Sequence, residues 1–257
     1  MQENELVAPE YLSPSSINTF RQCPLKFKYS KLDGLVDPSG HEAILGNFVH
    51  DILEDLYKLP AEFRTQAEAR AIAKEQWDKK WHAEICRLIR SEKELTRFRW
   101  AAWWCVENLW KLENPLNVGF DGLEKYVRGK MGGVKIHGYI DRYSVTNSVS
   151  TVGDYKTGKT PKKAYLEDKF FQLIIYSFLL SENDVSADSR MVELLYLKDG
   201  VRFEKSVSDS DIQEAAELIQ TTKEQIDEKC RTGNFEAKKS ILCNWCGFKS
   251  FCPAWQK

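Results

Sequence analysis

Residues 123–146 read LEKYVRGKMGGVKIHGYIDRYSVT, and residues 150–158 continue with STVGDYKTG. The first stretch alternates apolar and polar residues on both sides of a glycine pair at 132–133, a pattern typical of two antiparallel strands joined by a tight turn. The second stretch predicts a third strand that runs into a turn. Two carboxylates, Asp141 and Asp154, therefore lie on neighbouring predicted strands.

The sequence that follows predicts further strands and helices. Residues 170–180 predict an apolar helix, and two more strands are expected at 191–197 and 201–207, on either side of the turn at 199–200. A last amphipathic helix is expected over residues 208–232. This order predicts an α/β (α+β) fold in which helices flank a central mixed sheet.

The sequence before the hairpin is predicted to be helical. Ser13 and Pro14 are typical of a helix start, and Pro24 is expected to interrupt that helix. An apolar stripe predicts a second helix over about 42–58. Residues 62–112 contain no proline or glycine, and two or three helices are expected there.

Four tryptophans recur within the last of these helical segments. Exposed tryptophans can form a platform on which nucleic-acid bases stack. Aromatic residues at helical spacing more often pack inward, however. We therefore expect these residues to form the core-facing side of a helix: Trp100, Trp103, Trp104 and Trp110.

Composition and charge are those of an ordinary globular protein. Hydrophobic residues make up 42% of the chain and charged residues 29%, with a net charge of −1. No run approaches the roughly 18 consecutive apolar residues that a membrane span needs, and residues 1–12 lack the features of a signal peptide. We therefore expect a cytoplasmic protein that does not associate with membranes. The small net charge argues against binding of nucleic acid over the whole surface.

The chemistry that the sequence suggests depends on carboxylates next to a lysine. Asp141 and Asp154 could hold Mg²⁺ or Mn²⁺, because these ions prefer hard oxygen ligands. Lys156 lies two residues beyond Asp154, and residues i and i+2 of a strand face the same side. The lysine could therefore orient a water molecule or stabilise charge on a phosphate in the same cleft.

An Asp-x-Lys triplet alone is common in a highly charged chain, and its position gives it weight here. Its place between a carboxylate-bearing strand and a helix resembles the PD-(D/E)XK nuclease superfamily, in particular its RecB-like branch. That branch includes AddB-like nuclease domains and CRISPR-associated nucleases. The resemblance runs from about Ser13 to Cys252 and implies a restriction-endonuclease-like sheet. It also implies a metal-dependent DNA exonuclease that prefers single strands.

Two further motifs support this resemblance. The sequence LGNFVH at 45–50 is similar to the first family motif, in which a helix-borne histidine contributes to the metal site, and Gln172 and Tyr176 are similar to a Gln-x-x-x-Tyr element. Glu54, one turn after that histidine, could assist or could form a surface ion pair. The metal ligands implied by the resemblance are His50, Asp141, Asp154 and the backbone carbonyl of Tyr155. The implied catalytic residues are Asp141, Asp154, Lys156, Gln172 and Tyr176.

Seven cysteines in a chain expected in the cytosol are not typical of a disulfide framework. Four thiolates can hold either Zn²⁺ or a [4Fe-4S] cluster, and the chemistry alone favours zinc. A set of one N-terminal and three C-terminal cysteines resembles the ligands of iron–sulfur RecB-like nucleases, which implies a [4Fe-4S] cluster. These residues are Cys23, Cys243, Cys246 and Cys252. Cys230 is the one plausible substitute, and Cys86 and Cys105 are expected to be buried in helices and inert.

The expected organisation is one nuclease domain over residues 1–257, with the cluster joining its N- and C-terminal segments. It would comprise a helical subregion at about 42–112, a sheet core at about 120–207, and a C-terminal helix and cysteine cluster at 208–257. The sequence around Gly158-Lys159-Thr160 has only the tail of a phosphate-binding loop, so a helicase or CRISPR integrase would be a separate partner.

Three alternatives to a repair or recombination exonuclease stay open at the level of sequence. A CRISPR-associated nuclease that trims DNA before spacer acquisition would share every motif above. A non-catalytic iron–sulfur module that binds DNA would retain the cysteines without the reaction. In a zinc protein without nuclease function, the aspartates and the lysine would coincide by chance.

Overall fold

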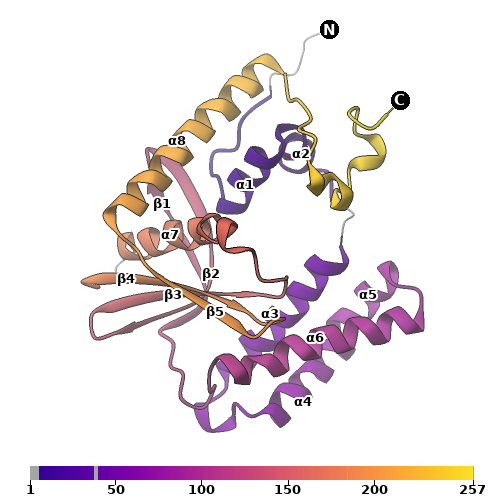
Figure 1. The fold of residues 1–257 in the computed structure, drawn as a ribbon, viewed down its shortest axis with the longest axis vertical. Coiled ribbons are helices and arrows are strands. Elements are labelled where there is room, and N and C mark those ends of the chain that lie inside the picture. Colours follow the sequence, from indigo (N-terminus) through magenta and orange to yellow (C-terminus); the bar gives the residue numbers. More distant parts are fainter. Residues whose placement is uncertain (1–5, 38–39, 184, 257) are drawn as a thin grey trace.

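The computed structural model describes residues 6–37, 40–183 and 185–256, and its elements surround a five-stranded sheet (Figure 1). The sheet order is β1-β2-β3-β4-β5, in which β3 and β4 are parallel and the other neighbours are antiparallel. The predicted mixed sheet is thus confirmed. The strands are β1 Gly122–Met131, β2 Val134–Thr146, β3 Val149–Lys156, β4 Ser189–Tyr196 and β5 Val201–Ser206.

The helices agree closely with the helical segments predicted from the sequence. Ser13 caps the first helix, which ends before Pro24, and three α-helices fall within residues 62–112. The α-helices are α1 Pro14–Gln22, α2 Pro24–Phe27, α3 His41–Lys58, α4 Gln66–Gln76, α5 His82–Leu88, α6 Glu92–Leu112, α7 Glu167–Glu182 and α8 Asp209–Thr232. The shorter helical segments are η1 Lys28–Leu32, η2 Ala61–Phe63, η3 Trp77–Trp81, η4 Lys163–Tyr165, η5 Ile241–Trp245 and η6 Lys249–Phe251.

The sheet separates two clusters of buried side chains. Leu194 of β4 belongs to a cluster with α1, α7 and α8, whereas its neighbour Leu195 belongs to a cluster with α3 and α6. Successive strand residues point to opposite faces, so the two clusters cover opposite sides of the sheet. Tyr155 of β3 packs in the second cluster, which brings α3 against the strand that bears the Asp-x-Lys triplet.

The expectation that the tryptophans of α6 face the core is wrong for two of them. Trp100 is 68% exposed and Trp104 is 51% exposed, whereas Trp103 and Trp110 are half-buried. The core stripe of α6 is formed instead by smaller apolar residues around Phe98 and Leu109. With 3.6 residues per turn, positions 100 and 104 lie away from that stripe. Cys105 is buried as predicted, but Cys86 is only half-buried.

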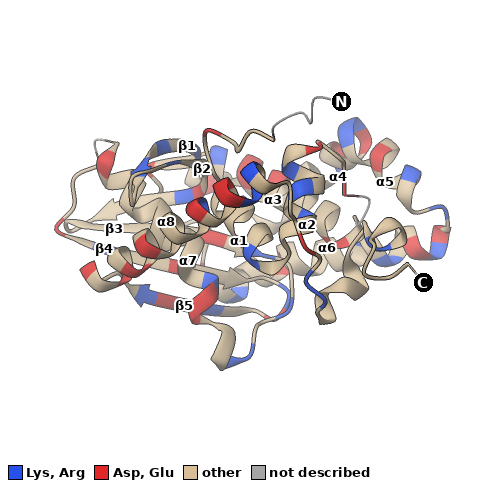
Figure 2. Cartoon of the chain, turned by 90° about the horizontal axis from the view of Figure 1, so that it is seen from above, with Lys and Arg blue, Asp and Glu red and all other residues tan. Residues whose placement is uncertain are grey.

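Two further expectations concern the outside of the molecule. In the described ranges, no helix combines the length and the apolar character that crossing a bilayer requires. Residues 1–5, which are part of the segment expected to lack a signal peptide, lie outside the described residues. Acidic and basic side chains are interspersed over the elements (Figure 2), in agreement with the net charge of −1.

A buried arginine connects the helical region to the sheet. Arg142 of β2 is 2% exposed, and its guanidinium pairs with Glu113 at 2.6 Å and with Glu193 of β4. It also donates a hydrogen bond of 2.5 Å to the hydroxyl of Tyr155. A side chain at Gly153 would not fit, because a Cβ there would lie 2.6 Å from Nε of Arg142.

We expect Arg142→Leu to lower the free energy of unfolding by about 3 kcal/mol or more, because it leaves the buried Glu113 without its cation and Glu193 with Arg202 alone. Urea unfolding followed by circular dichroism would measure the change. The control is Lys223→Ala, which removes an exposed ion pair with Asp227 and should cost about 0.5 kcal/mol or less. Equal, small losses in both variants would contradict a structural role for the buried arginine.

Candidate functional site

His50 of α3 points to the place where β2 and β3 lie side by side. Its Nε2 lies 2.8 Å from the carbonyl oxygen of Tyr155, and its Nδ1 lies 3.4 Å from Oδ2 of Asp141. The backbone N–H of Tyr155 donates a hydrogen bond of 3.1 Å to the same oxygen of Asp141. The structure therefore brings together three of the predicted metal ligands, from one helix and two strands.

Asp154 lies deeper beside this group and is 4% exposed. Its Oδ2 is 2.5 Å from Nζ of Lys156, yet no described residue donates a well-aligned hydrogen bond to this buried oxygen. Burial and, next in size, the charge of Asp154 raise the pKa of Asp141 to about 7. Two carboxylates in such a desolvated place repel each other, and a cation between or beside them would relieve that cost.

Lys156 remains a cation in this environment. Burial disfavours its charged form, but the charges of Asp154 and Asp141 outweigh burial, so the pKa of Lys156 lies above its ordinary value. A lysine that keeps its proton can stabilise negative charge on a phosphate or orient a water molecule. It cannot act as a general base near neutral pH, which leaves proton removal to other groups.

Gln172 and Tyr176 project from α7 toward the same strands. The hydroxyl of Tyr176 interacts with the side chain of Gln172 and with the backbone of Tyr139, while burial and then the charge of Asp154 raise its pKa. Lys156 forms its ion pair with Asp154, whereas the hydroxyl of Tyr176 bonds to the backbone of β2. Gly138 makes room for the tyrosine, since a Cβ there would lie 2.3 Å from its hydroxyl oxygen.

The sequence-based prediction did not include Glu124 of β1, which lies opposite Asp141. The ladder pairs Leu123 with Arg142 and Lys125 with Ile140, and between them Glu124 adopts a left-handed φ of 46°. Burial and then the charge of Glu54 raise the pKa of Glu124. Glu54 itself forms an ion pair of 2.7 Å with Lys58, and an ion pair is one of the two roles predicted for it.

Comparisons with known proteins agree with this arrangement. Residues 11–253 match the family model of the PD-(D/E)XK nuclease superfamily. The chain belongs to this superfamily. It is therefore a nuclease by family, and its five-stranded mixed sheet flanked by helices is the fold that we expected from the resemblance.

Two individual proteins illustrate how distant the relatives are. The Gene 69 protein of Mycobacterium phage L5 is 22% identical over 292 residues, which cover 95% of this chain and 96% of that protein. A crystal structure of a candidate exonuclease from Eubacterium rectale superposes with a TM-score of 0.50 at 15% identity, covering 92% of this chain and 87% of that one. At this level of identity the superposition supports the fold alone.

PD-(D/E)XK nucleases use divalent metals, and the residues of this nuclease fit such an ion. His50, Glu124 and Asp141 each offer one ligand atom, and these atoms all lie within 4.8 Å of one another. Together with Tyr155 they line a hollow of about 10 Å³. Two carboxylates, an imidazole and a carbonyl form a donor set suited to Mg²⁺ or Mn²⁺. Asp154 lies outside this trio, although its charge acts on Asp141.

The four cysteines from the two ends of the chain line one cavity of about 60 Å³. The backbone N–H of Lys238 donates a hydrogen bond to the sulfur of Cys23, and the N–H of Ser240 donates one to the sulfur of Cys243. The hydrogen bond from Ser240 is the main cause of the lowered pKa of Cys243. Cys230 is buried in α8 and is not among the residues that line this cavity.

The two candidate occupants, zinc and a cluster, require different spacings between the four sulfurs. Zinc–sulfur bonds of about 2.3 Å in a tetrahedron place the sulfurs only about 3.8 Å apart. Among the described residues, no three cysteine sulfurs lie within 4.8 Å of one another. Lysines at four positions also line the cavity and would offset the charge of several thiolates: Lys26, Lys238, Lys239 and Lys249.

We expect Glu124→Gln to weaken the binding of Mn²⁺ by about ten-fold or more, because the amide removes one charge from the ligand set. Isothermal titration calorimetry with MnCl₂ would measure the affinity. The matched control is Glu54→Gln, which lines the same hollow but pairs with Lys58 and should change the affinity much less. Equal affinities in the two variants would remove Glu124 from the metal site.

Proposed function

We propose that the protein is a metal-dependent DNA exonuclease of the RecB-like branch that prefers single strands. The observation that supports this most directly is the group formed by His50, Asp141 and the carbonyl of Tyr155, next to the Asp154–Lys156 ion pair. It combines a site for a divalent cation with a fixed positive charge. Hydrolysis of a phosphodiester requires both kinds of group.

Each residue of this group has a definite task in the proposed reaction. A divalent cation, when bound, would polarise the phosphate and activate a water molecule. Asp141 and His50 would hold it from two different elements, and Asp154 would keep the ammonium group of Lys156 in place. Lys156 would then stabilise the negative charge that develops on the phosphate. Tyr176 and Gln172 would fix the position of β2 from the side of α7.

The preference for single strands is supported by the surroundings of the site. Tyr139, two residues before Asp141, is 58% exposed and forms a ring contact with Tyr126, which is 46% exposed. Exposed aromatic rings stack unpaired bases. Exposed cations also follow β3 and lie on the helical region, and binding of DNA through them should weaken as the salt concentration rises. These cations are Lys159, Lys162, Lys163, Arg87, Arg90, Arg97 and Arg99.

We expect Asp154→Ala and Lys156→Ala to abolish cleavage of DNA while the protein stays folded, because both side chains contribute charge rather than packing. Lys156→Ala should still bind Mn²⁺. Cleavage with Mg²⁺ or Mn²⁺ would be compared on linear single-stranded, linear duplex and closed circular single-stranded DNA. Loss of linear single strands with circles spared would support an exonuclease. Equal attack on circles would indicate an endonuclease, and full activity of Asp154→Ala would refute the assigned site.

We also propose that the four cysteines hold a [4Fe-4S] cluster. The support comes from their common cavity, from the four lysines that line it and from the resemblance described above. The cluster would connect α2 to the C-terminal segment, which run side by side in Figure 1. A helicase or a CRISPR integrase as partner, and a role in repair, recombination or spacer acquisition, stay predictions that rest on the resemblance. The same holds for a single nuclease domain.

Protein purified without oxygen should be brown and contain about four irons per chain. Cys23→Ser should bleach this colour and lower the stability, because the cluster closes a loop over most of the chain. Cys86→Ser is the matched control, since Cys86 is half-buried in α5 and does not line the cavity. A colourless protein with stoichiometric zinc would contradict the proposed cluster.

A further inference from the structure

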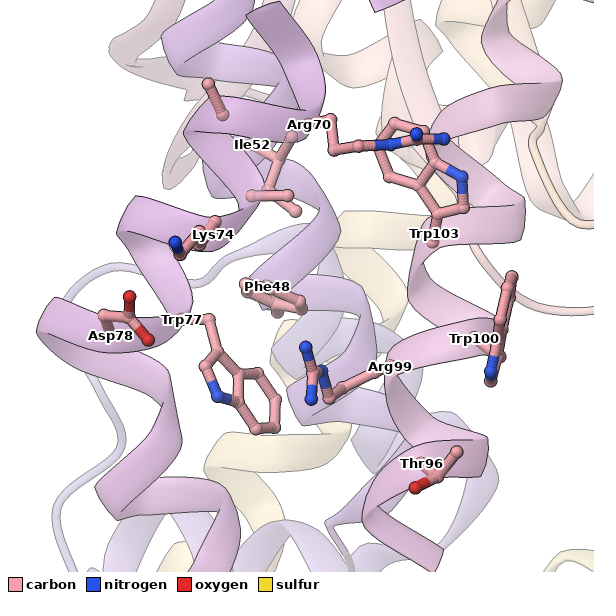
Figure 3. A pocket seen from close by; sticks show the side chains of 12 residues that line it. Phe48, Ile52, Arg70, Lys74, Trp77, Asp78, Thr96, Arg99, Trp100 and Trp103 are labelled. Carbon is pink, nitrogen blue, oxygen red and sulfur yellow. The ribbon is translucent and has the colours of Figure 1, made fainter. Parts of the chain in front are cut away.

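A hollow of about 790 Å³ lies in the helical region, between α3, η3, α4 and α6 (Figure 3). Its walls combine aromatic rings with cationic side chains. Trp77 of η3 and Arg99 of α6 face each other across it, and Trp103 lies above them. We call this hollow the aromatic pocket, and its rings and cations belong to Phe48, Arg70, Lys74, Trp77, Arg99, Trp100 and Trp103.

Two arginines of the aromatic pocket contact indole rings and not carboxylates. The guanidinium of Arg70 lies 4.7 Å from the ring centre of Trp103, and that of Arg99 lies 5.2 Å from the ring centre of Trp77. Within the part of the chain that the structure describes, neither guanidinium nor Lys74 forms an ion pair. Asp78 is the one carboxylate in the lining. The pocket therefore has positive charge that the protein does not neutralise.

Trp100 offers a free aromatic face at the rim. Its side chain is 68% exposed, and no other ring or cation in the described ranges contacts it. The segment 62–112 around it contains 11 lysines and arginines against 8 aspartates and glutamates, although the whole chain has a net charge of −1. Positive charge is thus concentrated in the same region as the exposed indole.

The aromatic pocket is separate from the metal site. Phe48 and Ile52 of α3 line the pocket, whereas His50, between them in sequence, contacts Asp141 and Tyr155. Residues two apart on an α-helix point about 200° away from each other. The two sites therefore lie on opposite sides of the same helix, and a ligand in the pocket would not compete with the metal.

We propose that the aromatic pocket binds unpaired nucleotides of a single-stranded nucleic acid at a distance from the cleavage site. Bases would stack on Trp100 and on the indoles inside the pocket, and phosphates would pair with Arg70, Lys74 and Arg99. A peptide could use either the rings or the cations. A nucleotide supplies planar rings and negative charge in a single unit, which matches both features of the lining.

The test measures binding without divalent metal, so that it does not depend on the proposed cleavage. The probe is a fluorescent oligothymidylate of about ten nucleotides, within the range of known single-strand sites. Trp100→Ala should weaken its binding by about five-fold or more, the effect of losing one stacked base. Arg99→Ala should also weaken it and should reduce its dependence on salt.

Matched controls lie on the same helix. Trp104→Ala removes an indole that is 51% exposed and is not part of the pocket, and Lys93→Ala removes an exposed cation outside it. Both should leave the affinity nearly unchanged. An abasic probe of the same length should bind equally to the parent protein and to Trp100→Ala, because it has no base to stack.

Each other outcome has a definite meaning. Equal effects of Trp100→Ala and Trp104→Ala would overturn the proposal. It would also be overturned if Trp100→Ala left the oligonucleotide affinity unchanged but abolished self-association in sedimentation, because the pocket would then hold a second copy of the chain. If no variant or parent protein cleaves DNA but the binding contrast persists, the catalytic proposal fails and this one stands.

Discussion

The buried ion pairs of Arg142 hold the candidate site together. The guanidinium connects Glu113, at the end of α6, with Glu193 of β4, and it also contacts the hydroxyl of Tyr155. The backbone of Tyr155 contributes both an N–H and a carbonyl to the group around His50. Desolvated charges at this position are costly unless they are fully paired. Separating the helical region from the sheet would therefore leave Arg142 or Glu113 without its partner.

Much of this fold could be predicted from local patterns in the sequence. The alternating hairpin, the apolar helix at 170–180 and the helix start at Ser13 each have short-range signals, and the structure confirms all of them. The orientation of Trp100 could not be predicted in that way. It depends on which stripe of α6 meets α3, and smaller residues of α6 occupy that contact. Tertiary packing, which the sequence pattern does not specify, determined the outcome.

Glu124, by contrast, could have been predicted from the sequence as a neighbour of Asp141. The two-glycine turn fixes the register of the hairpin, and counting outward from it brings position 124 opposite position 141. Its left-handed backbone, by contrast, could not have been inferred from sequence. In the metal trio, His50 and Asp141 belong to motifs that resemble the family. Glu124 could have been found only from the pairing of the two strands.

The same turn limits how this sequence can vary through evolution. Side chains along a strand alternate between faces, so inserting one residue in either arm of the hairpin would turn Glu124 or Asp141 to the other side of the sheet. Substitutions elsewhere in β1 and β2 would leave that alignment intact. Among descendants of this chain, the number of residues between the two carboxylates should therefore be inherited more faithfully than the identities of those residues.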